Sequence, residues 1–256
     1  PHINPAILSA VLYPQDAQVQ PMLTAAEILR NAAARVTVVT NAEVTSIERD
    51  AAGAVTAIVT SRGRCATPVV VNAAGTWGGG IAQLAGVELP IHPRRGFILV
   101  TTPQPVMVHH KVYTAEYLAN VASDNEGLET STVVEGTRAG TILIGASRER
   151  VGFDRSINYE ALQKLAAGAI AIFPFLKDIK LLRTYSGFRP YCPDHLPVIG
   201  PDSRVPGLFH ACGHEGAGVG LAPASGKMIA DAVMQRATAV ALAPFNPVRF
   251  EEAADV

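Results

Sequence analysis

Residues 208–226 read Leu-Phe-His-Ala-Cys-Gly-His-Glu-Gly-Ala-Gly-Val-Gly-Leu-Ala-Pro-Ala-Ser-Gly. The first five form an apolar run typical of a strand, and helical spacing extends from about residue 222 to residue 235. Between them, Gly213, Gly216, Gly218 and Gly220 let the backbone turn sharply and let a flat ligand approach it without hindrance from Cβ atoms. Unpaired N–H groups at the start of the helix favour negative charge there. This order of strand, glycine turn and helix predicts an α/β layer with a ligand at the turn.

The glycine pattern differs from the fingerprint that binds dinucleotides. If Gly216 and Gly218 are its first two glycines, the third position is Leu221, and no βαβ unit follows. A Rossmann-like NAD enzyme is therefore disfavoured. A strand–helix connection that needs its glycines for packing alone stays open as the plainer alternative.

A second segment, residues 187–200, reads Gly-Phe-Arg-Pro-Tyr-Cys-Pro-Asp-His-Leu-Pro-Val-Ile-Gly. Pro190 cannot donate to a sheet, so the strand expected over residues 181–188 should end near it. Arg189 could then form two parallel hydrogen bonds to a ligand carboxylate. An ion pair with Asp194 or another nearby acid is an equal alternative.

A third segment, residues 69–77, reads Val-Val-Val-Asn-Ala-Ala-Gly-Thr-Trp. The almost continuous valine run predicts a strand over residues 68–72 that is buried on both faces. The small residues after it would let a cofactor pass close to the carboxyl end of the strand, where open α/β sheets bind ligands. Tight packing is the plainer explanation of this segment taken alone.

The rest of the chain predicts an antiparallel sheet inserted between two α/β segments. Helices are expected at residues 21–34, 81–85 and 158–173. Strands are expected at residues 36–40, 43–49, 55–61, 97–101, 106–113, 117–122, 128–134, 141–144 and 197–200. The fold class is therefore mixed α/β, with divisions at residues 1–90, 91–180 and 181–256.

Composition restricts the partners. With 21 Lys and Arg against 22 Asp and Glu, the formal charge is −1, so no basic surface favours nucleic acid or anionic lipid. No apolar run reaches the roughly 18 residues of a membrane span. The three cysteines have an irregular spacing that suits neither a disulfide framework nor a zinc site. We therefore expect a small-molecule ligand and a reducing, cytoplasmic location.

The histidines predict no metal site. His109 and His110 are adjacent and the others are scattered, without HExxH or Cys/His spacing. Solvent-facing or hydrogen-bonded histidines, among them His195 and His210, are expected instead.

Together the three segments resemble the D-amino-acid oxidase-like flavoprotein superfamily, which includes glycine oxidase, sarcosine oxidase and bacterial amino-acid dehydrogenase subunits. The specific part is Gly-Phe-Arg-Pro combined with Gly-His-Glu-Gly-Ala-Gly-Val-Gly-Leu-Ala-Pro at this separation. The resemblance covers most of the chain. It implies a partial Rossmann-like FAD-binding layer, residues 1–90 and 181–256, with an inserted antiparallel-sheet substrate domain, residues 91–180.

The resemblance also implies roles for individual residues. Arg189 would bind the substrate carboxylate, and hydride would pass from the α carbon of an amino acid or amine to flavin N5, giving an imine. His214 and Glu215 could tune the protonation of flavin or substrate, or they could hold the turn by local hydrogen bonds. The implied FAD contacts are Val44, Ala74, Gly75, Gly213, Gly216, Gly218, Val219, Gly220 and Leu221.

One part of the family pattern is absent. The family opens with a βαβ unit of about 30 residues whose GxGxxG binds the FAD pyrophosphate, and no such pattern occurs here. We expect an N-terminal truncation that leaves the fragment alone inactive; the alternative is a substrate-binding remnant that does not hold FAD by itself. The Gly-His-Glu variant is similar to subunits of heteromeric dehydrogenases, so a partner redox subunit and a location at the periphery of the inner membrane are further expectations.

Overall fold

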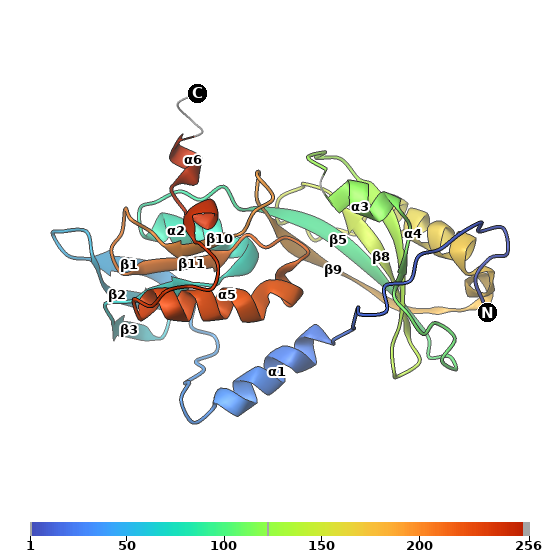
Figure 1. Ribbon diagram of the computed structural model, residues 1–256, viewed down its shortest axis with the longest axis horizontal. Coiled ribbons are helices and arrows are strands. Elements are labelled where there is room, and N and C mark those ends of the chain that lie inside the picture. Colours follow the sequence, from blue (N-terminus) through green and yellow to red (C-terminus); the bar gives the residue numbers. More distant parts are fainter. Residues whose placement is uncertain (1, 122, 253–256) are drawn as a thin grey trace. The chain divides into compact units, whose positions relative to one another are not determined.

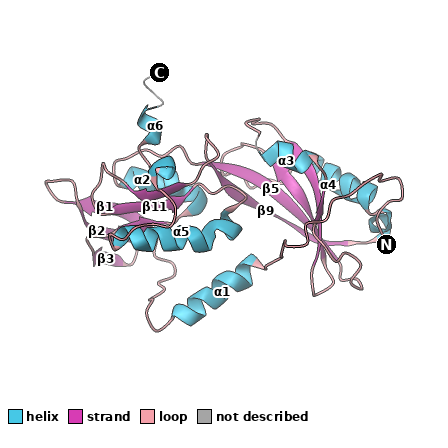
Figure 2. Cartoon of the chain, in the orientation of Figure 1, coloured by secondary structure: helices cyan, strands magenta, loops and turns pink. Residues whose placement is uncertain are grey.

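The structure of the chain, a computed structural model, describes residues 2–121 and 123–252. Helices and strands are interspersed along it (Figures 1 and 2), and the mixed α/β fold expected from the sequence is confirmed. The chain divides into two compact units. The first unit comprises Pro1–Val19 and Arg94–Phe188, and the second comprises Gln20–Pro93 and Arg189–Val256. The functions expected for these segments stay predictions.

The first unit is built on a five-stranded sheet of order β6-β7-β8-β5-β9. The pairs β6–β7, β7–β8 and β8–β5 are antiparallel. The strands are β5 His92–Thr101, β6 Val112–Tyr113, β7 Glu129–Gly136, β8 Ile142–Arg148 and β9 Leu181–Tyr191. The chain passes from one unit to the other within β5 and within β9.

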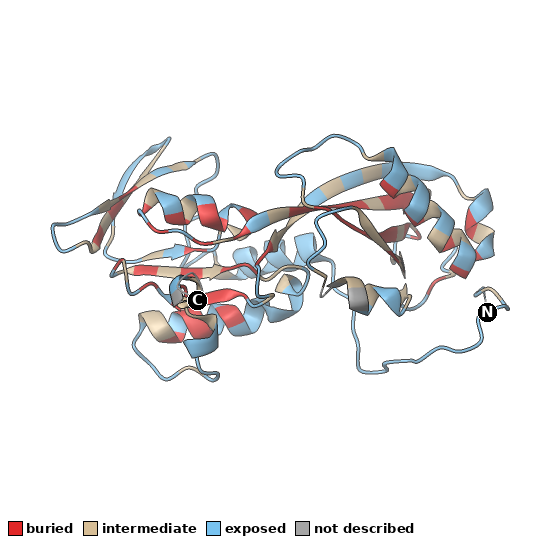
Figure 3. Cartoon of the chain, turned by 90° about the horizontal axis from the view of Figure 1, so that it is seen from above, coloured by how far each residue is buried: buried red, intermediate tan, exposed pale blue. Residues whose placement is uncertain are grey.

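Helix α4, Tyr159–Ile172, packs on this sheet and presents one buried and one exposed face (Figure 3). It begins where the side chain of Asn158 accepts a hydrogen bond from the N–H of Ala161, which satisfies one of the donors that a helix start leaves open. Helical spacing places Leu165 and Ala169 on its buried face. These residues join one apolar cluster with Phe97, Leu99, Val134, Ile142 and Ile144 of the sheet.

The strand expected at residues 117–122 is wrong. Residues 117–121 belong to helix α3, Glu116–Val121, and Ala122 lies outside the described residues. The side-chain amide of Asn120 donates to the carbonyl of Thr130 and to the hydroxyl of Ser131, so the helix packs against β7. A short apolar run does not distinguish helix from strand, and the tertiary contact decided this one. The strand expected at residues 106–113 is likewise reduced to β6.

The second unit contains two three-stranded sheets. One is antiparallel, with order β1-β2-β3: Val44–Arg49, Val55–Thr60 and Gly63–Ala66. The other has order β10-β11-β4: Val198–Pro201, Leu208–Cys212 and Val70–Asn72. In it β11 pairs antiparallel with β10 and parallel with β4.

Strand β11 separates two apolar clusters because successive side chains of a strand point to opposite faces. Leu208 and Cys212 pack in the cluster that includes Ala82 of helix α2, Gly78–Leu84. Phe209 packs against the cluster of Met228 in helix α5, Gly218–Val233. Helix α2 therefore covers one face of the sheet, and α5 covers β10 and β11 on the other face. The other elements are α1 Pro21–Ala32, η1 Gly75–Trp77, η2 Pro174–Asp178, η3 Ala243–Phe245 and α6 Arg249–Glu252.

Two strand expectations in this unit are wrong. Residues 36–40 form no strand, and Val38 and Val39 are 56% and 58% exposed. Strand β4 is not buried on both faces either, since Val71 within it is 43% exposed. Within the described residues β4 ends its sheet and pairs along one edge only. A run of valines indicates an apolar strand, but it does not indicate which strand or helix packs against that strand.

Helix α5 begins four residues earlier than expected, at Gly218 rather than Ala222. Gly218 and Gly220 therefore belong to its first turn instead of to the preceding loop. Pro223 lies inside the helix rather than at its start. A proline there leaves the carbonyl of Val219 without its helical donor, which is tolerated near the helix end.

Gly207→Ala tests whether the backbone that leads into β11 is closely packed against the segment before β4. Gly207 has φ +90°, and a methyl group there would overlap the carbonyl oxygen of Pro68, beside β4. Gly53 has a similar φ of +84° with no atom within 4 Å of an added Cβ. Gly53→Ala should cost about 1 kcal/mol of unfolding free energy through its backbone conformation alone. Gly207→Ala should cost at least about 2 kcal/mol more, since overlap adds to strain. Urea unfolding measures both; equal losses would contradict the packing described here.

Candidate active site

The two segments expected to contact a cofactor leave the sheet at the same edge. Strands β4 and β11 are parallel, with Val71 opposite Phe209 and Asn72 opposite His210. Ala74 and Gly75 follow β4, and the turn that begins at Gly213 follows β11. Both turns therefore lie at the carboxyl edge of the parallel pair, where open α/β sheets bind ligands.

The turn after β11 leaves its backbone accessible. Gly213 has φ +77°, a conformation that favours glycine. An added Cβ at Gly220 would meet no atom within 4 Å, and the same holds at Gly75 in the other turn. Val219 and Leu221, in the first turn of α5, are 49% and 42% exposed. Open backbone, apolar side chains and the N–H groups of a helix start suit a flat ring with a polar edge such as a flavin.

Arg189 lies against this turn. An added Cβ at Gly216 would come 3.9 Å from Cδ and 4.0 Å from Nε of Arg189. The absence of a side chain at residue 216 thus leaves space that the arginine stem borders. Asp194, one of the acids that could have paired with Arg189, is bound by Arg249 at 2.6 and 3.1 Å. The role of Arg189 toward a substrate stays a prediction.

His214 and Glu215 connect the turn to neighbouring segments. Nε2 of His214 lies 2.8 Å from the hydroxyl of Ser225, which is buried in α5. Burial lowers the pKa of His214, so its neutral form is favoured. Glu215 contacts the segment that follows Arg189 and also His195. These are local hydrogen bonds of the kind that the sequence left open, and catalytic roles for both residues stay predictions.

Val44, the remaining expected contact, begins β1 in the other sheet of this unit. It packs against the apolar cluster that contains Cys212. The two cysteines nearest the turn are thiols, because burial raises the pKa of Cys192 and of Cys212 to about 12. Neither is therefore suited to act as a nucleophile at neutral pH.

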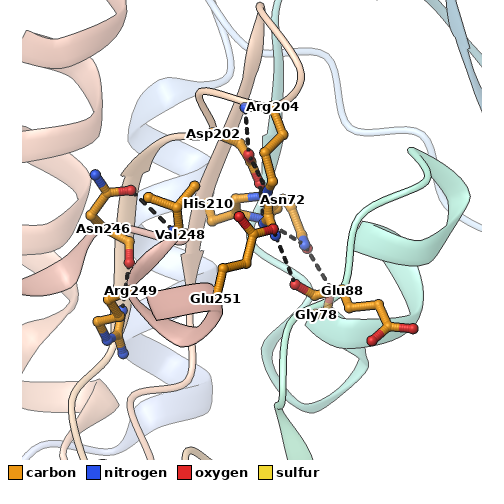
Figure 4. A network of polar contacts seen from close by, with 10 residues as sticks. All are labelled: Asn72, Gly78, Glu88, Asp202, Arg204, His210, Asn246, Val248, Arg249 and Glu251. Atoms are coloured by element: carbon orange, nitrogen blue, oxygen red, sulfur yellow. Dashed lines mark hydrogen bonds and ion pairs between the residues drawn. The ribbon is translucent and has the colours of Figure 1, made fainter. Parts of the chain in front are cut away.

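A buried polar chain connects β4 with β11 (Figure 4). The side-chain oxygen of Asn72 accepts from the N–H of Ala74, and its amide nitrogen donates to the carbonyl of Gly78. This orientation directs the same nitrogen toward Nδ1 of His210, 3.1 Å away. Nδ1 must then accept, so His210 carries its proton on Nε2 and donates to Asp202, also at 3.1 Å.

Arg204 continues the chain to the C-terminal segment (Figure 4). Its guanidinium binds both carboxylate oxygens of Asp202, at 2.8 and 2.7 Å, and a third nitrogen contacts Glu251 at 2.7 Å. Burial alone would raise the pKa of Asp202, but hydrogen bonds from Arg204 and His210 outweigh it and hold the pKa well below its usual range. Asp202 is therefore ionised wherever the protein is folded near neutral pH.

This polar chain is not predicted by the sequence. From the sequence, His210 is expected only to face solvent or to form hydrogen bonds, and Asp202 has no predicted role. One signal was present: His210 occupies an inward position of β11, between Leu208 and Cys212, where an apolar residue is expected. A fully buried histidine needs partners for both ring nitrogens, and those partners could not be identified from the sequence.

Asp202→Asn should change the acid dependence of stability. Because the folded-state pKa is lowered, the contribution of Asp202 is present above its unfolded pKa, about 3.9, and is lost as the pH falls below it. The variant should lose about 2 kcal/mol of unfolding free energy near pH 7. Between about pH 5 and about pH 2 its stability should then fall less steeply than that of the unchanged protein, because the asparagine has no carboxylate to protonate. Urea unfolding at several pH values measures this, and parallel acid limbs would contradict it.

Within the described residues, no helix is long and apolar enough to cross a membrane.

A profile of the FAD-dependent oxidoreductase family matches residues 1–232. Hydrogen cyanide synthase subunit HcnC of Pseudomonas protegens is 33% identical over 74% of this chain and 42% of its own length. Glycine oxidase of Pseudomonas aeruginosa is 33% identical over 75% of this chain and 49% of its own length.

Two solved structures share the fold. L-proline dehydrogenase from P. horikoshii has a TM-score of 0.80 and 25% identity, over 90% of this chain and 59% of that one. Glycine oxidase from Geobacillus kaustophilus has a TM-score of 0.76 and 27% identity, over 89% of this chain and 57% of that one. The chain spans about half the length of the curated relatives that it matches.

Proposed function

This chain belongs to the FAD-dependent oxidoreductase family, and we propose that the protein oxidises an amino acid, or a primary or secondary amine. FAD, when bound, would supply the acceptor for the hydride that leaves the α carbon of the substrate, and the product would be an imine. The observation that carries the proposal is Arg189 lying beside the bare backbone of Gly216, at the carboxyl edge of β4 and β11. A guanidinium, which is suited to a carboxylate, thus extends from a position beside backbone that is bare enough for a flat ring.

The residues of the chain orient the reactants, and FAD supplies the redox chemistry when bound. Residues 216–221 would hold the flavin against their bare backbone and apolar side chains. The N–H groups at the start of α5 would stabilise negative charge on a group bound beside them, as preorganised dipoles do. Arg189 would bind the carboxylate of the substrate through two hydrogen bonds and so orient its α carbon for oxidation. No protein base is required if the substrate amine arrives neutral.

The names of the relatives favour an amino acid over a simple amine. Two of them are oxidases or dehydrogenases of glycine and L-proline, which both carry an α-carboxylate. HcnC is described as a subunit. A partner subunit that accepts electrons from the flavin is therefore part of the proposal.

Anaerobic flavin reduction tests the activity directly. The full-length protein, purified with FAD, should be yellow and should lose its flavin absorbance when mixed with a suitable amino acid. A panel of amino acids and of the matching decarboxylated amines identifies the substrate class. A full-length protein that stays colourless with added FAD, or that no member of the panel reduces, would refute the proposal and favour a substrate-binding remnant.

Arg189→Lys tests the carboxylate-binding residue. Lysine keeps the charge but cannot make two parallel hydrogen bonds, so KM for the amino acid should rise roughly tenfold or more while FAD content stays unchanged. Arg183→Lys, a conservative change at an exposed position of the same strand, is the matched control and should leave KM unaltered. Unchanged steady-state kinetics in Arg189→Lys would remove Arg189 from this role.

A further inference from the structure

Glu215 links the glycine turn to the chain segment immediately after Arg189. Its backbone N–H donates to the carbonyl of Pro190 at 3.2 Å. Its carboxylate Oε1 accepts from the N–H of Cys192 at 3.4 Å. One residue thus holds two successive peptide groups of the segment that continues from Arg189.

His195 makes the second half of the link. Its Nδ1 lies 2.9 Å from the same Oε1 of Glu215. Since an ionised carboxylate can only accept, Nδ1 carries the proton and donates. The ring also packs edge-on against Tyr191, with centroids 5.8 Å apart and an interplanar angle of 82°. The side chain of His195 is 30% exposed and that of Glu215 is 13% exposed, so the pair is partly shielded from water.

Both residues have left-handed backbone conformations. The φ angle is 57° at His195 and 47° at Glu215. Such conformations cost a non-glycine residue on the order of 1 kcal/mol or more and persist where surrounding contacts require them. Here the two strained residues are hydrogen-bonded to each other, next to the turn that Arg189 borders.

The loop that carries His195 is also held by the C-terminal segment. Arg249 binds the carboxylate of Asp194 at 2.6 Å and the carbonyl of Leu196 at 2.8 Å. The residues on either side of His195 are therefore fixed from that direction. Because the loop is fixed, the imidazole has little freedom to leave Glu215.

We propose that His195 and Glu215 form a positioning pair that holds Arg189 beside the glycine turn and thereby sets how tightly the substrate carboxylate is bound. The inference rests on the proposed function, because it assigns Arg189 a carboxylate ligand. His195 touches neither substrate nor cofactor in this role. It acts through Glu215, which anchors the peptide groups that follow Arg189. The pair thereby fixes the backbone position from which the Arg189 side chain extends.

Two substitutions separate the hydrogen bond from the backbone strain. His195→Gly relieves the left-handed conformation but removes the donor, whereas His195→Asn tolerates that conformation and supplies an N–H donor near the position of Nδ1. In the full-length, FAD-loaded protein, His195→Gly should raise KM for the amino acid roughly tenfold, with kcat and FAD content unchanged. His195→Asn should restore most of the loss. Gln235→Gly, at an exposed residue with φ 54°, is the strain-matched control and should leave the kinetics unchanged.

A double-mutant cycle tests whether His195 acts through Arg189. In the Arg189→Lys background, His195→Gly should add little further loss, because the interaction that it supports is already gone. Fully additive effects on KM, or wild-type kinetics in His195→Gly, would overturn the positioning role while the amino-acid oxidation itself stood. A full-length protein that no amino acid reduces would instead refute the proposed function, and the positioning role with it.

Discussion

The parallel pairing of β4 with β11 is the constraint on which the candidate site depends. It makes two turns, separated by more than a hundred residues of sequence, leave the sheet at one edge. One turn contributes small residues after Asn72, and the other contributes bare backbone and the start of α5. A slip of one residue in this register would exchange the inward and outward faces of β11, so that His210 would lie on the α5 side and Phe209 on the α2 side.

The buried chain of Asn72, His210 and Asp202 specifies that register. Burying these groups is costly unless each is paired, and the pairing found here works only with Asn72 directly opposite His210. Arg204 and Glu251 extend the same chain to the C-terminal segment. The carboxyl edge of the sheet is thus held by directional bonds in addition to apolar packing, which alone would tolerate small shifts.

Many of the turns and element ends around the site were predictable, because they depend on residues close together in the sequence. The glycines at 213, 216, 218 and 220 predict an open backbone. Pro190 predicts that Arg189 lies close to the end of its strand, and Asn158 predicts the start of α4. The helix start at Gly218 was missed, since glycine is a poor helix former and its place in the first turn is stabilised by packing of α5 on the sheet. The same reliance on packing explains why residues 117–121 form a helix despite their resemblance to a strand.

By itself, the sequence determined the mixed α/β class and the antiparallel sheet between two α/β segments, and it predicted a glycine turn and an arginine as the segments that carry chemistry. Only the tertiary structure decided that Arg189 borders Gly216, that β4 is open on one face, and that His210 and His195 have specific acidic partners. The physical reason is the range of the interactions. Turn chemistry and helix or strand periodicity act between residues a few positions apart. These contacts instead join residues from 8 to well over 100 positions apart, and no local sequence pattern identifies the partner.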